Sequence, residues 1–437
     1  MSAAWINDVW MSVADWQRAA AVYLPLTAAL TARMVHGRQP RQIAVSLLGV
    51  LWVIPTLLAV QSINAWAGWW SFADGGSQFR GMPLECFIGW VILWGLLPQL
   101  AFPRIAIHWL VAIMVAADLA IMPLCKPLVQ LGPHWLLGET FAVAGVLAPA
   151  LCVARWTSNR THLRARVALQ VATSGLLFLY LVPEIVFALR PGTGWRPLLH
   201  EVSWLRQIEI QLLLLIAVPG VSAAMEFAER GHGTPIPYDP PQRLVTSGMY
   251  RYCANPMQMS CVAVMLLWAG ILRNGWLILA AAMSAIYSAG IAHWDEREDL
   301  VRRFGNEWRT YRAQVQNWRF RWSPYHSGSS ARIYIAASCG PCSELRSWLE
   351  ARSLVGLHII DTEELLPGSI RRVRYYPADG SSPVEGVRAM GRALEHLNCG
   401  WAMAGALLRI PGIWQGVQLL MDASGLGPRT LITTSRS

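Results

Sequence analysis

The stretch "MSCVAVMLLWAGILRNGWLILAAAMSAIYSAGIAH", residues 259–293, decides the class of fold. It contains two apolar runs, near 259–273 and 276–293, that are joined by an Arg-Asn-Gly turn. Two such runs with a turn signal between them predict a tight pair of membrane helices. Each run is shorter than the roughly 20 residues that cross a hydrocarbon core, so we expect these helices to be tilted or partly sheltered.

Seven further apolar runs precede this hairpin. They lie near residues 16–34, 42–61, 84–102, 105–123, 135–154, 166–189 and 207–226. The chain is 54% hydrophobic and only 14% charged, whereas an ordinary soluble domain is about 25% charged. The 23 Trp residues also suit a membrane protein, because indole favours the bilayer interface. The sequence therefore predicts an all-α polytopic membrane protein with about nine transmembrane helices, followed by a soluble domain.

The distribution of cations predicts the orientation of these helices. Arginine-rich segments follow the first, fifth and seventh runs and the hairpin, at residues 33–41, 155–166, 230–251 and 297–321. Alternating passage puts all of them on one side, which the positive-inside rule makes cytoplasmic. We therefore expect a multi-pass protein of the inner or plasma membrane with a cytoplasmic C-terminal domain. These loops explain the net charge of +10. The sequence has no stripe of basic residues with interleaved aromatic residues, so a nucleic-acid partner is not expected.

The composition changes at residues 326–331, where Ser and Gly predict a linker. Beyond it, "ARIYIAA" and "LHIID" predict strands, and "RRVRYYPADGSSPVEG" predicts a β-hairpin. The predicted domains are therefore a helical membrane domain (1–228), a core around the hairpin (229–325), the linker (326–331) and a soluble α/β domain (332–437). A Ser/Gly-rich linker also predicts few contacts across it, so that the last domain would be separable.

Two polar blocks flank the membrane hairpin. "PPQRLVTSGMYRYCANPMQ", residues 240–258, precedes it, and "DEREDLVRRFGNEWRTYRAQV", residues 295–315, follows it. The proline-rich start cannot continue a helix, and irregular backbone at a bilayer face must line a cavity or a ligand. Carboxylate, amide and Tyr side chains would thus converge at one end of the hairpin. A solvated, charge-rich helix end would explain the composition equally well.

These blocks, with the hairpin between them, resemble the isoprenylcysteine carboxyl methyltransferase and phospholipid methyltransferase family over about residues 229–325. The resemblance implies an S-adenosylmethionine-dependent methyltransferase whose acceptor is a membrane lipid or a lipid-linked molecule. It implies a cofactor site between the hairpin and the helices that follow. The residues that it assigns to the cofactor are Gln242, Arg243, Leu244, Val245, Tyr250, Asn255, Pro256, Met257, Gln258 and Glu296.

The sequence departs from that family at several positions, and the predicted cofactor binding tolerates these changes better than the predicted substrate does. Ala292 stands where isoprenylcysteine enzymes have a substrate-binding Arg, and Ala254 and Gln258 also differ from the usual residues. "WDER", "GNEWRTY" and "SPY" resemble sterol reductases instead, which implies an NAD(P)H-dependent reductase as an alternative. A third alternative is a membrane thiol redox relay with a decayed methyltransferase core, in which residues 1–228 form the functional unit.

The soluble domain begins with a Cys pair, Cys339 and Cys342, in "SCGPCSEL" between a strand and a helix. The helix N-terminus favours a thiolate at Cys339, so we expect Cys339 to be the attacking thiol and Cys342 the resolving thiol. Zinc would need two more ligands, and only the distant His396 and Cys399 are available, so we expect no metal. Two unlinked thiols are the remaining alternative.

The rest of this domain resembles the DCC-family thiol–disulfide oxidoreductases, a thioredoxin-related group, over about residues 331–435. The resemblance is carried by the Asp-Gly at residues 379–380, by Gly386 and Ala389, and by the Pro-Gly at residues 411–412. It implies a thioredoxin-like fold and a thiol redox partner.

Within the predicted spans, Asp118, Glu139 and Glu184 are candidate functional carboxylates, because ionisable groups are costly in hydrocarbon.

Overall fold

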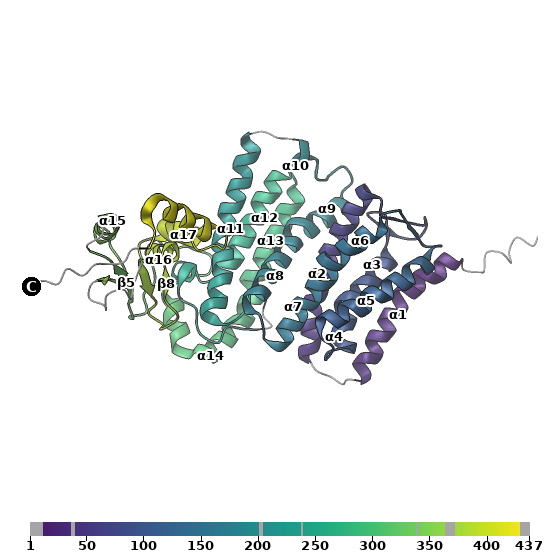
Figure 1. Ribbon diagram of the computed structural model, residues 1–437, viewed down its shortest axis with the longest axis horizontal. Helices are drawn as coiled ribbons and strands as arrows, with labels where there is room; N and C mark the ends of the chain where they lie inside the picture. Colours follow the sequence, from purple (N-terminus) through teal and green to yellow (C-terminus); the bar gives the residue numbers. More distant parts are fainter. Residues whose placement is uncertain are drawn as a thin grey trace, which may run out of the picture. The chain divides into compact units, whose positions relative to one another are not determined.

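The structure is a computed structural model that describes residues 12–35, 40–200, 204–236, 239–337, 340–362 and 372–428. The side chains of residues 40, 199–200 and 291–297 lie outside the described part. The chain forms two compact units, one of residues 1–185 with 234–239 and one of residues 186–233 with 240–437 (Figure 1). Each unit has its own buried apolar core. Apolar helices predominate in the described part, as the sequence predicts.

The first unit is almost entirely helical. Its helices are α1 (Val13–Val35), α2 (Pro40–Ala67), α3 (Leu84–Trp90), η2 (Val91–Leu96), α4 (Leu97–Ala101), α5 (Ile107–Ile121), η3 (Met122–Cys125), α6 (Trp135–Ala142), η4 (Val143–Leu147), α7 (Ala148–Asn159), α8 (Leu163–Leu176) and η5 (Leu177–Leu181). Helix α9 (Val182–Leu189) begins in this unit, which ends at residue 185. Two short antiparallel pairs close its loops, β1 (Trp70–Phe72) with β4 (Val129–Leu131) and β2 (Gln78–Phe79) with β3 (Met82–Pro83).

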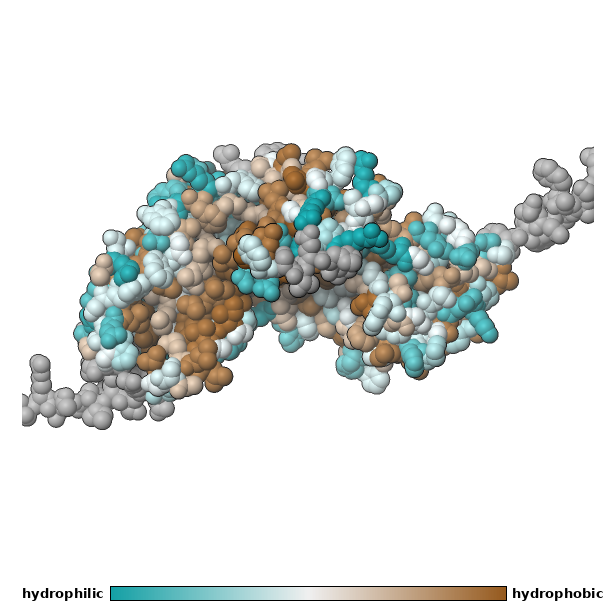
Figure 2. All heavy atoms as spheres, turned by 90° about the horizontal axis from the view of Figure 1, so that it is seen from above, coloured by the Kyte–Doolittle hydropathy of each residue, from teal (hydrophilic) through white to brown (hydrophobic). Residues whose placement is uncertain are grey.

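Six helical stretches among the described residues are long and apolar enough to cross a membrane. They are Arg41–Ala67, Leu84–Ala101, Ile107–Cys125, Trp135–Asn159, Leu163–Leu189 and Trp204–Gly231, and they match the second to seventh predicted spans. Large apolar side chains lie exposed along several of them, such as Trp109 and Ile113 on α5, and Figure 2 shows contiguous hydrophobic surface beside hydrophilic surface. Exposed apolar helix faces of this kind are typical of proteins whose solvent is lipid. The chain is therefore a helical, membrane-type protein.

The second unit contains the predicted hairpin. Its helical elements before the linker are α10 (Arg196–His200), α11 (Trp204–Gly231), η6 (Gly248–Arg251), α12 (Pro256–Ile271), α13 (Gly275–Tyr287), η7 (Ser288–Ala292) and α14 (His293–Gln314). Helix α12 packs against both α11 and α13. At the turn, Asn274 accepts a hydrogen bond from the backbone N–H of Trp276 at 3.0 Å, which satisfies a donor that the start of α13 would otherwise leave free. This confirms the helical hairpin.

The last part of the second unit is an α/β domain, as predicted. Its elements are β5 (Ala331–Ile335), α15 (Gly340–Glu350), β6 (Leu357–Asp361), β7 (Arg374–Tyr376), β8 (Val384–Glu385), α16 (Val387–Leu394), α17 (Cys399–Leu407), α18 (Ile413–Met421) and η9 (Asp422–Leu426). The sheet order is β6-β5-β7-β8, with β5 parallel to β6 and the other pairs antiparallel. The turn between β7 and β8 contains Asp379, which accepts hydrogen bonds from Ser381, and Gly380 at φ 72°. The predicted β-hairpin is therefore confirmed.

Candidate functional site

The two polar blocks that flank the hairpin lie against each other. Ala254, from the first block, is buried in an apolar cluster with Trp308 and Tyr311 of α14. The Tyr311 hydroxyl donates to the backbone carbonyl of Tyr250 at 2.8 Å, and the Ala254 N–H donates to the carbonyl of Gln316 at 2.9 Å. The chain that leaves the hairpin thus returns to the loop that enters it, as the sequence predicts.

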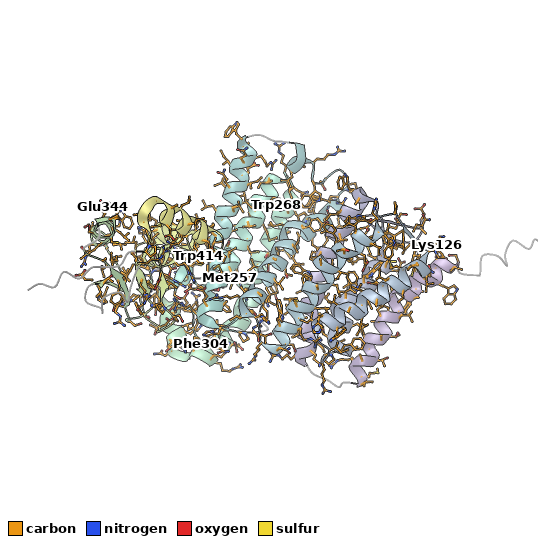
Figure 3. All side chains as sticks on the ribbon, in the orientation of Figure 1. Lys126, Met257, Trp268, Phe304, Glu344 and Trp414 are labelled. Carbon is orange, nitrogen blue, oxygen red and sulfur yellow. The ribbon has the colours of Figure 1, made fainter. Side chains whose placement is uncertain are left out.

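The residues that the resemblance assigns to the cofactor differ in their surroundings. Val245 and Tyr250 are buried, and they pack with Met257 against α11. Leu244 packs instead on the cluster formed by α14. Figure 3 labels Met257 and, on α14, Phe304 among the side chains of these two clusters. The apolar members therefore help to hold the two blocks together.

The polar members lie nearer the surface. Gln242 and Arg243 are exposed, and the backbone N–H of Gln242 donates to the carbonyl of Gly231 at 2.6 Å. Asn255 and Gln258 are half-buried, and the Asn255 amide donates to the Gln258 side-chain oxygen at 3.1 Å. Pro256 follows Asn255 at the start of α12, where its missing N–H costs little. These side chains leave hydrogen-bonding groups within reach of solvent at the entrance of the hairpin.

The predicted cofactor residue Glu296 lies in α14, but its side chain is outside the described residues. A different residue of α14 connects the two blocks. Arg303 donates to the backbone carbonyl of Pro241 and lies 3.3 Å from the Asp299 carboxylate. This arginine was not predicted from the sequence, although a proline-rich loop has many carbonyls and few N–H donors and so suits a cationic partner from the second block.

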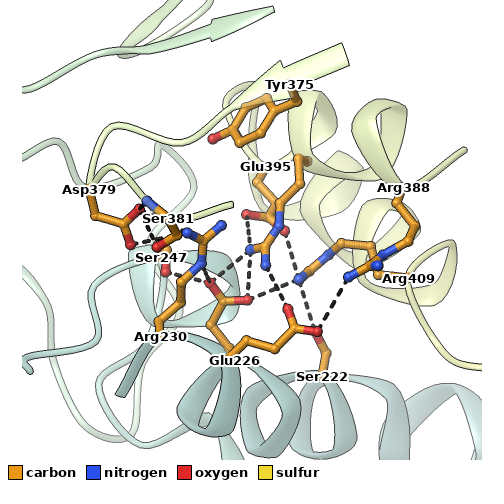
Figure 4. Close-up of polar contacts among 12 residues, drawn as sticks. Ser222, Glu226, Arg230, Ser247, Tyr375, Asp379, Ser381, Arg388, Glu395 and Arg409 are labelled. Atoms are coloured by element: carbon orange, nitrogen blue, oxygen red, sulfur yellow. Dashed lines mark hydrogen bonds and ion pairs between the residues drawn. The ribbon is translucent and has the colours of Figure 1, made fainter. Parts of the chain in front are cut away.

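A cluster of charged side chains joins α11 to the α/β domain (Figure 4). Glu226, on α11, is fully buried and accepts from Arg392 at 2.7 Å and from Arg409 at 2.9 Å. One turn further along α11, Arg230 lies 3.6 Å from Glu226 and donates to Asp379 at 2.8 Å. The cluster pairs four arginines with four carboxylates: Arg230, Arg388, Arg392 and Arg409 with Glu226, Glu229, Asp379 and Glu395. We call these eight residues the α11 charge cluster.

The α11 charge cluster is balanced in charge, with four arginines and four carboxylates, and each of its buried charges has an ion-pair partner. Burial disfavours the charged form of Arg392, but the nearby Glu226 and Glu395 carboxylates favour it more strongly. They hold the pKa of Arg392 well above its usual range. Burial likewise opposes the charge on Asp379, yet the hydrogen bonds from Ser381 and the nearby Arg230 lower the pKa of Asp379. The expectation of few contacts across the 326–331 linker is therefore wrong: this domain is docked through buried ion pairs.

A second set of buried contacts joins the α/β domain to the first polar block. Tyr252 is fully buried, and its hydroxyl donates to the backbone carbonyl of Glu395 at 2.9 Å. His396, also fully buried, lies with Nδ1 2.8 Å from the carbonyl of Val355 and Nε2 2.9 Å from the Tyr375 hydroxyl. Burial and the neighbouring Arg251 lower the pKa of His396 well below its usual range. The ring is therefore neutral near pH 7, with both nitrogens engaged.

The Cys pair is described only in part. Cys342 lies half-buried in α15 and packs on the core of the α/β domain with Leu345 and Trp348. Cys339 is outside the described residues. The predicted strand and helix on either side of the pair are both present, as β5 and α15.

No protein-family model matches the chain, and comparison with curated proteins and with solved structures found no match either.

Proposed function

We propose that this protein is an integral-membrane S-adenosylmethionine-dependent methyltransferase that acts on a lipid or another membrane-embedded acceptor. One observation carries the proposal: the two blocks that resemble the methyltransferase family, about 40 residues apart in sequence, are packed together through Tyr311 and Ala254 at one end of the hairpin. A solvated helix end would not require these contacts. The proposal places the cofactor at this junction.

The chemistry of the side chains there fits such a cofactor. Asn255 and Gln258 offer amide donors and acceptors, and the exposed Arg243 offers a guanidinium for a carboxylate. The buried Tyr250 and Val245 offer apolar contact. When bound, the cofactor supplies a methyl group on a sulfonium centre. In this proposal the residues of the chain bind and orient it and exclude water, and Glu296 accepts hydrogen bonds from its ammonium or ribose.

The proposal includes the topology predicted from the sequence, with nine spans and the α/β domain in the cytoplasm. The six long apolar helices and the two shorter ones of the hairpin support eight of these spans. Helix α1 covers the remaining one. The Arg-rich segments remain the argument for the side of the membrane.

We also propose that the α/β domain is thioredoxin-like and that Cys339 and Cys342 act as a dithiol. The sheet supports this, because a parallel β5-α15-β6 unit followed by an antiparallel β7-β8 pair is the strand arrangement expected of that fold. The docking of this domain on α11 favours one alternative, a membrane thiol redox relay. An NAD(P)H-dependent reductase is the other alternative, and it rests on sequence resemblance.

Equilibrium binding to the purified full chain separates these functions. We expect S-adenosylmethionine to bind saturably and NADPH not to bind. The Asn255→Ala substitution should weaken S-adenosylmethionine binding about ten- to a hundredfold, the effect of losing a hydrogen bond to a charged ligand group. Asn159→Ala, which changes an exposed Asn of the first unit, is the matched control. Binding of NADPH alone would favour the reductase, and binding of neither would favour the redox relay.

A further inference from the structure

The first unit contains a small cavity whose walls are unusually rich in indole. Trp70, Trp90 and Trp94 line it together with Gln61 and Glu139. Its volume is about 30 Å³, whereas one water needs at least roughly 10–15 Å³. The cavity therefore has room for the end group of a ligand, about the size of two water molecules, but not for a whole lipid.

The structure describes no cationic side chain that pairs with the carboxylate in this cavity. Glu139 lies on α6 and is 8% exposed, and its Oε1 has no hydrogen-bond partner among the residues that the structure describes. Asp118, on α5, lies within electrostatic range of Glu139 and is equally buried. Its Oδ2 also lacks a partner in the described part of the chain. A buried carboxylate without a partner is costly, and inside a membrane helix such a residue marks a functional site.

A second wall residue has an unused polar group. Trp94 is 2% exposed, and its indole N–H has no acceptor within the described ranges. The Gln61 side chain, in contrast to Trp94, has partners for both of its polar groups. Its amide donates to the Arg80 carbonyl at 3.1 Å, and its oxygen accepts from the Trp70 indole at 3.2 Å. Two residues that line the cavity, Glu139 and Trp94, therefore each carry one buried polar atom without a hydrogen-bond partner among the described residues.

We propose that this cavity binds the charged end of an organic ammonium compound. The ammonium group donates to Glu139, and the indole rings stabilise its charge through cation–π contact, which is strongest for Trp. An oxygen of the ligand, or a water beside it, accepts from Trp94. A metal ion fits less well, since it needs several oxygen, nitrogen or sulfur ligands, and no group of three or more His, Cys, Asp or Glu that could hold one was found among the described residues. This inference does not depend on the methyltransferase proposal.

The test measures binding of radiolabelled methylammonium to the purified full chain in a non-ionic detergent at pH 7.5. We expect saturable binding at one site per chain, displaced by unlabelled methylammonium but not by the same concentration of methanol, which has nearly the same size and no charge. Glu139→Gln should weaken binding about ten- to a hundredfold. Glu209→Gln, which changes a partly exposed carboxylate of the second unit, should leave binding unchanged.

Three results would overturn the proposal. The first is the absence of saturable methylammonium binding. The second is displacement by methanol as effective as by methylammonium, which would show that the site does not recognise charge. The third is wild-type binding by a Glu139→Gln variant that unfolds at the wild-type temperature. If that variant does not fold, the methanol competition on the unaltered chain decides alone.

Discussion

Glu226 and Glu139 are both buried carboxylates on apolar helices, but their surroundings are opposite. Glu226 is fully buried, and Arg392, Arg409 and Arg230 surround it within 3.6 Å. Glu139 makes no ion pair with any residue that the structure describes, and one of its oxygens has no hydrogen-bond partner there. The first carboxylate is satisfied by its own chain and joins two parts of one unit. The second lacks a partner among the described residues, and the proposed ammonium site rests on this observation.

The comparison also predicts how each residue responds to substitution. Removing one partner of a buried ion pair leaves the other charge uncompensated in a medium of low dielectric constant, and that costs several kcal/mol. Removing an unpaired buried carboxylate leaves no charge behind. Substitutions at Glu226 should therefore affect stability, whereas those at Glu139 should affect ligand binding.

The largest effect is expected for Glu226→Gln, which keeps the shape of the side chain and removes the charge that faces three guanidinium groups. We expect it to lower the free energy of unfolding of the second unit by about 3–5 kcal/mol, as measured by proteolysis across a denaturant series. Glu229→Gln is the matched control, because the Glu229 side chain is 21% exposed and Arg392 keeps its pairs with Glu226 and Glu395, so we expect a smaller loss. Equal losses in the two variants would show that the burial of Glu226 does not determine how much it contributes to the free energy of unfolding.

A medium effect is expected on acidification, through His396. Its folded-state pKa lies well below the usual value, so the unfolded chain takes up a proton near pH 6.5 that the folded chain does not. Stability should therefore be fully present above that pH and fall as the pH falls below it, by about 1.4 kcal/mol between pH 7.5 and 5.5. Denaturant-dependent proteolysis at the two pH values measures this.

The control for the pH effect is His358, which is exposed. His396→Gln should remove most of the loss on acidification, whereas His358→Gln should retain it. A loss that persists in the His396→Gln variant would assign the pH dependence to other groups.

The smallest effect is expected for Tyr311→Phe, which removes a neutral hydrogen bond instead of an ion pair. The hydroxyl of this buried Tyr donates to the Tyr250 carbonyl, so its loss should cost about 0.5–1.5 kcal/mol. The readout is the thermal unfolding of the detergent-solubilised protein. Tyr287→Phe, at a 60% exposed position on α13, should leave the unfolding temperature unchanged. An equal shift in both variants would mean that the contact between the two blocks adds nothing to stability.

Local signals predicted much of the fold. The Asn-Gly turn predicted the α12–α13 hairpin, which Asn274 caps, and the Asp-Gly at residues 379–380 predicted the β7–β8 turn. The return of α14 to the first block also followed from the placement of the two blocks on either side of one hairpin. These features depend on residues near one another in sequence.

The α11 charge cluster could not be predicted in the same way. Arg392 and Arg409 lie 166 and 183 residues after Glu226, and no sequence spacing connects them. The Ser/Gly-rich linker was misleading, because its composition describes the linker and not the surfaces that it joins. A usable signal did exist in Glu226 itself, since an ionisable residue within a predicted apolar span is rare and marks a position that faces polar partners or a cavity. Removing residues 331–437 would take away Arg392 and Arg409, so truncation does not test cofactor binding independently.

We propose that the two blocks flanking the hairpin form one cofactor site. Hydrogen–deuterium exchange of the full chain with and without S-adenosylmethionine tests it most directly. We expect the cofactor to slow exchange both in residues 242–258 and in residues 295–311, with little change elsewhere. Slowed exchange in only one of these segments, or only in the α/β domain, would contradict the claim.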